Sequence, residues 1–189
     1  MRCLTCLHLS WQVICQRCQN ELLRPSIRVR HLEGLDVYSF YSYSEIEELL
    51  LSKYSLIGSA IFKILAKNSL KLFAKEFKTK AAVIGIDDRL NSFGYAHTAI
   101  LANSLKSSYL HPRFFKLIAQ NRVRYAGKSL EFRQKNPRDF RYTGFAEDII
   151  LVDDIVTTGT TLLEAKECCQ RARANVLFAL VLADAKDHL

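Results

Sequence analysis

Two adjacent carboxylates and a loop of hydroxyl groups lie between an aliphatic run and a helix near the end of the chain. The run Ile149–Val152 is mostly β-branched, which is typical of a strand buried on both faces of a parallel sheet. Asp153 and Asp154 follow it, at the edge where open α/β sheets bind their ligands. The loop Thr157–Thr161 then opens a helix predicted over Leu162–Arg173.

This spacing indicates a sugar phosphate as ligand. Backbone N–H groups and threonine hydroxyls in such a loop can hold a phosphate, helped by the positive end of the helix dipole. Adjacent carboxylates repel a phosphate and instead suit vicinal hydroxyls or a hydrated Mg²⁺ ion. The alternative is a strand that ends in solvated acids before an N-capping Thr. That alternative leaves the second acid and the remaining hydroxyls unexplained.

Four of the six cysteines lie in the first eighteen residues, as the pairs Cys3–Cys6 and Cys15–Cys18. In a reducing compartment, two Cys-x2-Cys turns favour a tetrathiolate Zn²⁺ site over disulfides. Redox-active or unpaired thiols are the alternative. We expect the site to be structural, because so small a module cannot bury a core of its own.

The composition points to anionic partners. The chain of 189 residues has 27 Lys and Arg against 19 Asp and Glu, a formal charge of +8. Nucleic acid, phosphates and acidic lipid are the partner classes that such a balance favours. No apolar run approaches the length of a membrane span, and the start of the chain lacks a signal-peptide core. We therefore expect a cytoplasmic protein, with peripheral contact to the inner membrane left open.

Strands alternating with helices predict a doubly wound α/β domain with a mostly parallel sheet, after a small N-terminal zinc-binding module. We expect the module and its link to occupy residues 1–33, with the link over 20–33, and the larger domain to occupy 34–189. Ser44 and Glu47 form a capping-box pattern at the start of one predicted helix. The other predicted elements are strands at 37–41, 81–86, 114–119 and 176–182 and helices at 57–77 and 97–105.

The stretch Ile149–Thr161 resembles the phosphoribosyl pyrophosphate (PRPP) motif of type I phosphoribosyltransferases. The resemblance implies that Asp153 and Asp154 take the ribose hydroxyls of PRPP and that Mg²⁺ accompanies this ligand. The 5′-phosphate would be bound by the loop residues Thr157, Thr158, Gly159, Thr160 and Thr161.

Paired Cys-x2-Cys turns ahead of such a domain are similar to the ComF family, which is associated with natural competence, the uptake of transforming DNA. Lys53-Tyr54 matches a Lys-Tyr pair of that family near the pyrophosphate loop, which implies a part in PRPP binding. Gly94-Tyr95 fits the family's Arg-Gly-(Phe/Tyr)-Asn-Gln stretch, as Arg133 and Asn136 fit a later Arg-x2-Asn. Phe93 and Ala96-His97 depart from that stretch.

A basic stretch over 122–142 is not explained by the fold. Its cations are Arg122, Arg124, Lys128, Arg133, Lys135, Arg138 and Arg141, and the stretch also contains four aromatic residues, Tyr125, Phe132, Phe140 and Tyr142. Long loops in compact domains are usually functional. By the resemblance, the stretch could close over PRPP as a mobile hood. The composition also suits single-stranded DNA, whose bases stack on aromatics while cations follow the backbone. An exposed charged loop is the third interpretation.

Two functions from different classes follow. The first is a PRPP-binding, DNA-handling protein of natural transformation, which transports single-stranded DNA with other competence proteins. The second is an active phosphoribosyltransferase that moves phosphoribose to a base or another acceptor. Fold alone cannot decide between them. A base-specific enzyme needs polar groups that read the base edge, and no stretch of the sequence identifies such groups, so enzymatic activity stays an open question.

Overall fold

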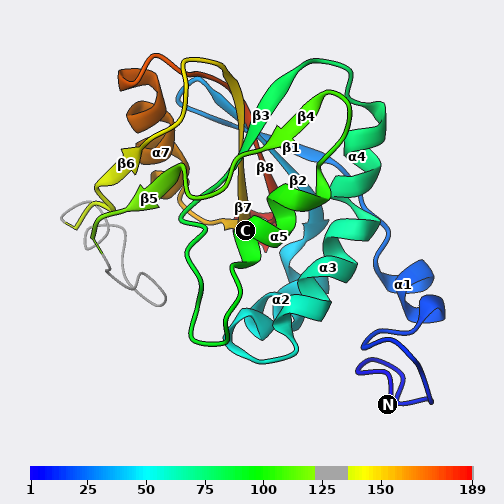
Figure 1. Cartoon of the computed structure of the whole chain (residues 1–189). Helices are drawn as coiled ribbons and strands as arrows, with labels where there is room; N and C mark the ends of the chain where they lie inside the picture. Colours follow the sequence, from blue (N-terminus) through cyan, green and yellow to red (C-terminus); the bar gives the residue numbers. More distant parts are fainter. Residues whose placement is uncertain (122–135, 189) are drawn as a thin grey trace.

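The computed structural model describes residues 1–121 and 136–188. A six-stranded sheet of order β1-β2-β8-β7-β3-β4 forms its centre (Figure 1). Every neighbouring pair is parallel except the β1–β2 hairpin. The predicted class, mixed α/β with a mostly parallel central sheet, is confirmed. The sheet strands are β1 (Arg28–Leu32), β2 (Leu35–Ser42), β3 (Ala81–Gly85), β4 (Leu110–Pro112), β7 (Asp148–Val156) and β8 (Asn175–Asp184).

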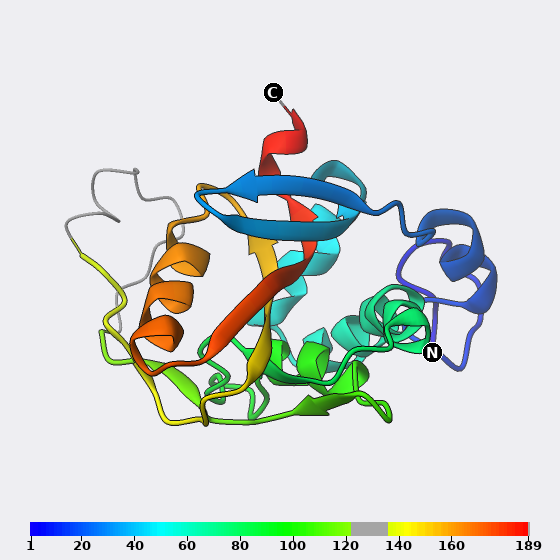
Figure 2. The same cartoon turned by 90° about the horizontal axis from the view of Figure 1, so that it is seen from above.

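Helices cover both faces of this sheet, as Figure 2 shows. One face carries α2 (Tyr43–Leu51), α3 (Gly58–Asn68), α4 (Leu70–Glu76) and α5 (His97–Ser104), and the other carries α7 (Thr160–Arg171). Strand β7 contributes side chains to both hydrophobic cores, because successive residues of a strand point to opposite faces of the sheet. Ile150 and Val152 belong to the cluster under α2–α5, whereas Ile149 and Leu151 belong to the cluster under α7. All four are fully buried, as a central parallel strand requires.

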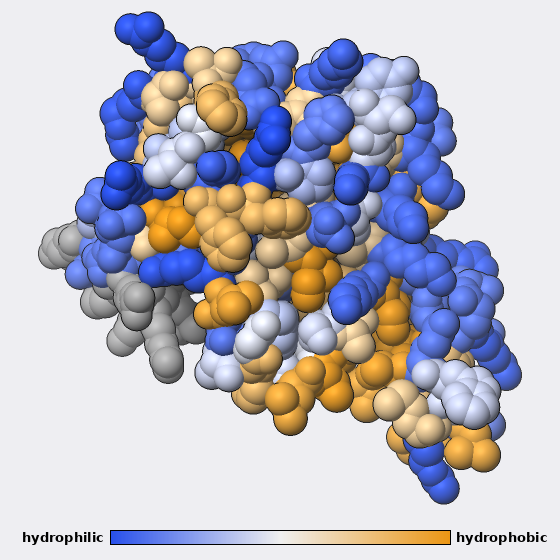
Figure 3. Space-filling model, in the orientation of Figure 1, coloured by the Kyte–Doolittle hydropathy of each residue, from blue (hydrophilic) through white to orange (hydrophobic). Residues whose placement is uncertain are grey.

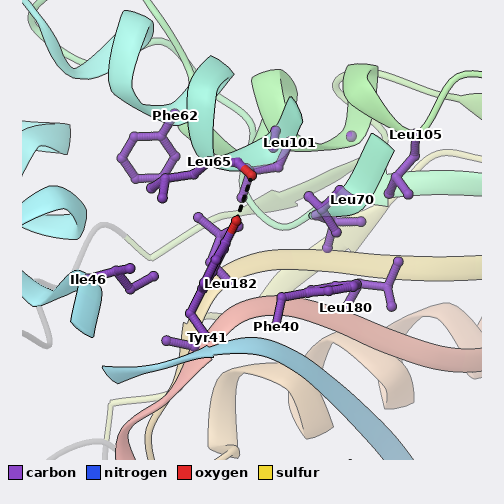
Figure 4. Packing of buried hydrophobic residues seen from close by; sticks show 14 of the residues in the cluster. Phe40, Tyr41, Ile46, Phe62, Leu65, Leu70, Leu101, Leu105, Leu180 and Leu182 are labelled. Carbon is purple, nitrogen blue, oxygen red and sulfur yellow. Dashed lines mark hydrogen bonds between the residues drawn. The ribbon is translucent and has the colours of Figure 1, made fainter. Parts of the chain in front are cut away.

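The larger core lies between β2, β8 and the helices α2–α5 (Figure 4). Phe40 and Phe62 fill it with aromatic surface, and Tyr41 contributes a ring whose hydroxyl donates a hydrogen bond to the Leu65 carbonyl at 3.3 Å. Burial raises the pKa of Tyr41 to about 12. The N-terminal segment packs on the same cluster, because Cys3, Ile14, Cys18 and Leu23 are buried there. Its helix α1 spans Gln16–Leu22.

The helix predicted over 57–77 is two helices. Ser69 separates α3 from α4 with a non-helical backbone, φ −128° and ψ −82°. Its hydroxyl donates to the Leu65 carbonyl at 2.8 Å. A serine side chain that bonds a helix carbonyl competes with the backbone ladder, which accounts for the break.

The predicted Ser44–Glu47 capping box is wrong by two residues. Strand β2 continues through Ser42, so the helix begins at Tyr43, and the Ser42 N–H donates to the Glu45 carboxylate at 3.2 Å. Glu47 instead accepts from the Tyr43 hydroxyl at 3.0 Å, one turn along the helix.

Two further segments differ from the prediction. The expected link over 20–33 contains β1, which pairs with β2 over its full length and extends the sheet. The strand predicted over 114–119 shortens to β5 (Leu117–Ala119), which pairs with β6 (Phe140–Tyr142) in a separate antiparallel ribbon. The strand starts later than predicted because Phe115, with a φ of 55°, lies outside the extended region. Among the described residues, no helix is both long and apolar enough to cross a bilayer.

Candidate functional site

The acid pair lies at the carboxyl end of β7, which runs four residues beyond the predicted strand, to Val156. Asp154 is buried, with 4 % of its surface exposed, and Asp153 is half-buried. The Asp154 N–H donates to the Asp153 carboxylate at 2.8 Å. The strand backbone therefore holds the Asp153 carboxylate, next to the loop that follows.

Two cationic or titratable side chains face this pair from other elements. Lys53, in the short 3-10 helix η1 (Ser52–Tyr54), places its Nζ 2.6 Å from the Asp154 Oδ2. His97, the first residue of α5, places its Nε2 3.8 Å from the same oxygen and packs on the Phe62 ring at 5.4 Å. Tyr54 is 61 % exposed, and its ring lies 5.5 Å from the Lys53 ammonium.

Burial and neighbouring charges shift the pKa values of the two acids in opposite directions. Burial raises the pKa of Asp153 well above its ordinary value, and the Asp154 charge raises it further. Burial would also raise the pKa of Asp154, but Lys53 and His97 outweigh that effect and hold it below its ordinary value. Burial lowers the pKa of His97 despite the nearby Asp154. Asp154 is therefore the more readily ionised carboxyl of the two.

The loop before α5 holds Lys53 in this position. The Tyr95 hydroxyl lies within hydrogen-bond distance of three backbone carbonyls, those of Ser52, Lys53 and Ser55, at 3.0–3.3 Å. The Asn91 side-chain amide donates to the Lys53 carbonyl at 3.1 Å. In the sequence, only the family resemblance indicates Tyr95. Its partners are backbone carbonyls, which every residue carries, so no second residue type marks the contact.

The Lys53–Asp154 pair gives a testable expectation for stability. Lys53→Met should leave Asp154 buried without its cation and lower the free energy of unfolding by about 2 kcal/mol, below the loss typical of fully buried pairs because Lys53 keeps 20 % exposure. Since the pKa of Asp154 is lowered, the pair stabilises the fold above about pH 4, and this contribution is lost as the pH falls through the lowered value.

Urea denaturation at pH 7 measures this loss. The double variant Lys53→Met with Asp154→Asn should regain part of it, because it removes the unpaired charge. If the double variant is no more stable than Lys53→Met alone, the ion pair does not account for the effect.

The hydroxyl loop forms a hollow directly after the acids. It is an open hollow of about 30 Å³, lined by Asp153, Ile155, Val156, Thr157, Thr158, Gly159, Thr161 and Leu162. Gly159 caps α7 with φ +88°, where a side chain would be strained, and a Cβ there would lie 2.4 Å from Leu32 Cδ1. The Thr158 and Thr160 hydroxyls bond each other at 3.0 Å. The hollow thus combines hydroxyls, a helix N-terminus and one carboxylate, as a sugar phosphate requires.

A second acid pair follows β3, the neighbour of β7. Asp87 accepts two hydrogen bonds from Arg89, at 2.7 and 2.8 Å, and Asp88 accepts the Phe115 N–H at 2.9–3.0 Å. Burial raises the pKa of Asp88. These acids hold the loop after β3 against β5, since the Asp87 N–H also donates to the Leu117 carbonyl. Their position after a buried strand was visible in the sequence, and their partners were not.

The apolar side chains beside Lys53 form an exposed rim. Leu56 and Ile57, in the turn between α2 and α3, are 76 % and 43 % exposed, and Leu90 and Phe93, in the loop before α5, are 64 % and 40 % exposed. Figure 3 shows hydrophobic residues gathered along the lower edge of this face, over that turn. These four exposed side chains offer no hydrogen-bonding groups to a ligand.

The four N-terminal cysteines converge on one point. Their sulfur atoms, from Cys3, Cys6, Cys15 and Cys18, all lie within 4.8 Å of one another, and all six cysteines of the chain are free. The Cys6 and Cys15 sulfurs are 3.7 Å apart, too far for a disulfide of about 2.05 Å. The cluster could therefore hold a metal ion.

The protonation of these thiols supports a cation at their centre. Burial would raise the pKa of Cys3, but the N–H groups of Cys15, Cys6 and Thr5 bring it to about 6. Burial and the neighbouring thiols raise the pKa of Cys18 to about 12. One thiolate therefore disfavours the others unless a cation compensates their charge, and four thiolates are the ligand set of structural zinc.

The structure places only part of the basic stretch. Arg122, Arg124, Lys128, Arg133 and Lys135 lie outside the described residues. Arg138 is half-buried, and its backbone N–H donates to the Glu164 carboxylate at 2.8 Å. Burial raises the pKa of Glu164, while Arg138 lowers it. Arg141, on β6, is exposed. Of these two arginines, Arg141 is the more accessible to a phosphate backbone.

Neither a protein-family model nor a curated protein matches the sequence. Solved structures similar to the chain include an adenine phosphoribosyltransferase, at 18 % identity over 90 % of each chain with a TM-score of 0.41. A hypoxanthine phosphoribosyltransferase from Staphylococcus aureus is 19 % identical over 67 % of this chain and 64 % of that one, with a TM-score of 0.42. Adenine phosphoribosyl transferase from Trypanosoma brucei is 12 % identical over 86 % and 88 %, with a TM-score of 0.44.

Proposed function

We propose that the chain binds PRPP with Mg²⁺ at the carboxyl edge of its sheet. The observation that supports this most is the continuity of the site, in which the Asp153–Asp154 pair and the hollow of Thr157–Thr161 follow each other on one strand–loop–helix unit. The ribose hydroxyls would meet the acids, and the 5′-phosphate would enter the hollow at the start of α7.

Mg²⁺ would share this edge of the sheet with the ligand. Carboxylate oxygens of Asp153 and Asp154 are the hard ligands that the ion prefers, either directly or through water. When bound, the ion offsets the charge of the pyrophosphate group. Lys53 supplies a protein cation at the same edge, and its bond to Asp154 keeps that carboxylate ionised.

The N-terminal module would hold one structural Zn²⁺ through Cys3, Cys6, Cys15 and Cys18. The donor set fits zinc, since four sulfurs converge and one thiol already has a lowered pKa. Gln19 ties the module to the main body by accepting from the Asn68 amide at 3.1 Å. A loss of metal would therefore disturb the face that carries α3 as well as the module.

We infer that the protein handles single-stranded DNA in natural transformation, as a member of the ComF family in the cytoplasm and at the inner face of the membrane. The formal charge of +8, the basic stretch and the resemblance in the cysteine pairs support this role. Turnover assays of PRPP with bases and with DNA separate the two functions.

DNA binding should depend steeply on salt. If about four phosphates are neutralised, the logarithm of the affinity should fall against log salt with a slope near −3. Replacing Arg133 and Lys135 with Ala should weaken binding and flatten the slope by about one to two units, as fluorescence anisotropy with labelled single strands would show. Lys63→Ala with Lys67→Ala, on α3, removes the same charge as a control. Equal effects in both variants would place the DNA site elsewhere.

A further inference from the structure

Arg30 hydrogen-bonds to the backbone of the loop Thr157–Thr161, called the phosphate loop below. This residue belongs to β1, yet its guanidinium reaches a loop 127 residues later in the chain, donating from Nη1 to the Thr157 carbonyl at 2.7 Å. Its Nη2 donates to the Thr158 carbonyl at 3.4 Å. The side chain is 15 % exposed, so these contacts are shielded from water.

These two hydrogen bonds orient two peptide planes. In a planar trans peptide the carbonyl and the N–H point in opposite directions. When Arg30 holds the Thr157 carbonyl, the Thr158 N–H of the same plane must point away from Arg30, and the same holds for the Thr158 carbonyl and the Gly159 N–H. Thr158 and Gly159 line the hollow in front of the loop. Arg30 therefore turns two N–H donors toward the place where a phosphate would lie.

The charge of Arg30 is balanced within the protein. Nη1 also donates to the Asp184 carboxylate at 3.0 Å, and that side chain is 7 % exposed. A paired guanidinium contributes little net field in the hollow. Its effect on a phosphate would thus come from the direction of the loop N–H groups rather than from attraction at a distance.

Other residues of the β1–β2 hairpin contact the phosphate loop and helix α7. The Leu32 side chain lies against Gly159, where an added Cβ would come within 2.4 Å of it. The Lys166 ammonium of α7 donates to the Glu33 and Gly34 carbonyls at the hairpin turn, at 3.1 and 2.8 Å. The hairpin thus touches the phosphate loop at one end and α7 at the other.

We propose that Arg30 is a positioning residue for phosphate binding, which presents the N–H groups of Thr158 and Gly159 to the 5′-phosphate of a sugar-phosphate ligand. This inference rests on the proposed function, since it specifies how the same loop holds its phosphate. It adds a residue from the N-terminal hairpin to a phosphate-binding hollow whose own lining belongs to one strand–loop–helix unit.

The test compares Arg30→Met and Arg30→Lys with the wild type, using ribose 5-phosphate as the probe. Calorimetry on folded protein should show about a tenfold loss of affinity in Arg30→Met, because a misdirected donor forfeits a hydrogen bond to a charged group. Arg30→Lys should lose less, because one ammonium can still bind Asp184 and one carbonyl. Arg24→Met removes the same charge from an exposed site and should bind like the wild type.

Amide spectra distinguish positioning from general stability. In the wild type, the Thr158 and Gly159 amide protons should shift downfield on adding ribose 5-phosphate, and in Arg30→Met both shifts should shrink. If Arg30→Met does not fold, Arg30→Lys carries the same comparison. If the folded variants keep the wild-type affinity for ribose 5-phosphate and the wild-type amide shifts, the inference about Arg30 is wrong, while the proposed function is unaffected. A wild type that binds neither ribose 5-phosphate nor PRPP would overturn the proposed function, and the inference with it.

Discussion

Replacing Cys15 and Cys18 with Ser is expected to remove the metal from the purified protein and to unfold its first twenty or so residues. Metal analysis should give about one zinc per wild-type chain, as a single four-ligand site requires. The binding free energy of structural zinc, about 10 kcal/mol or more in isolated fingers, is free energy of folding for such a module.

The loss should extend beyond the module. Cys18 and Ile14 are buried in the same cluster as α3 and α4, so amide exchange should quicken at the end of α3 as well as in residues 1–23. Cys168→Ser is the matched control, because it exchanges a buried thiol that bonds the Phe140 carbonyl and should leave the zinc content unchanged. Zinc-free protein whose first eighteen residues exchange as slowly as before would refute the assignment.

The double variant Asp153→Asn with Asp154→Asn is expected to lose most of its affinity for PRPP. A hydrogen bond to a charged group contributes roughly 1.5–3 kcal/mol, so two lost carboxylates should weaken binding about a hundredfold or more. Asp154→Asn alone should cost about ten- to a hundredfold. Ribose 5-phosphate should be affected equally, because it carries the same hydroxyls.

A control on the same strand separates this effect from general damage to β7. Asp148 lies at the exposed start of the strand and accepts from the Asn175 amide at 2.8 Å, so Asp148→Asn removes a carboxylate far from the hollow. Its PRPP affinity should equal that of the wild type. Unchanged affinity in the double variant would instead move the ligand site away from the acid pair.

The parts of the site that are contiguous in sequence could be predicted, and the parts contributed by distant segments could not. Asp153, Asp154 and the hydroxyl loop share one strand–loop–helix unit, so local periodicity and residue types sufficed. Lys53, which binds Asp154, lies 101 residues before it in the sequence, and only the family resemblance indicates a role for Lys53. Arg30 contacts backbone carbonyls, for which no side-chain pattern exists, and it lies in a segment expected to be a link.

The secondary structure elements likewise differ in how well the sequence predicts them. Buried strands such as β3 and β7 were predicted because continuous aliphatic runs leave few alternatives. Short strands such as β4 and β6, three residues each, carry too little pattern to be recognised. The break at Ser69 depends on one hydroxyl turning back to the Leu65 carbonyl, which helical periodicity does not reveal.

Calorimetric titration of the wild-type protein with PRPP in the presence of Mg²⁺ tests the central claim most directly. The site described above predicts saturable binding of one PRPP per chain, with ribose 5-phosphate competing for the same site because it shares the 5′-phosphate and the ribose hydroxyls. Thr158→Val should weaken both ligands by a similar and smaller factor, since the backbone N–H groups of the hollow remain. Absence of PRPP binding at millimolar concentration, or PRPP binding that ribose 5-phosphate does not displace, would contradict it.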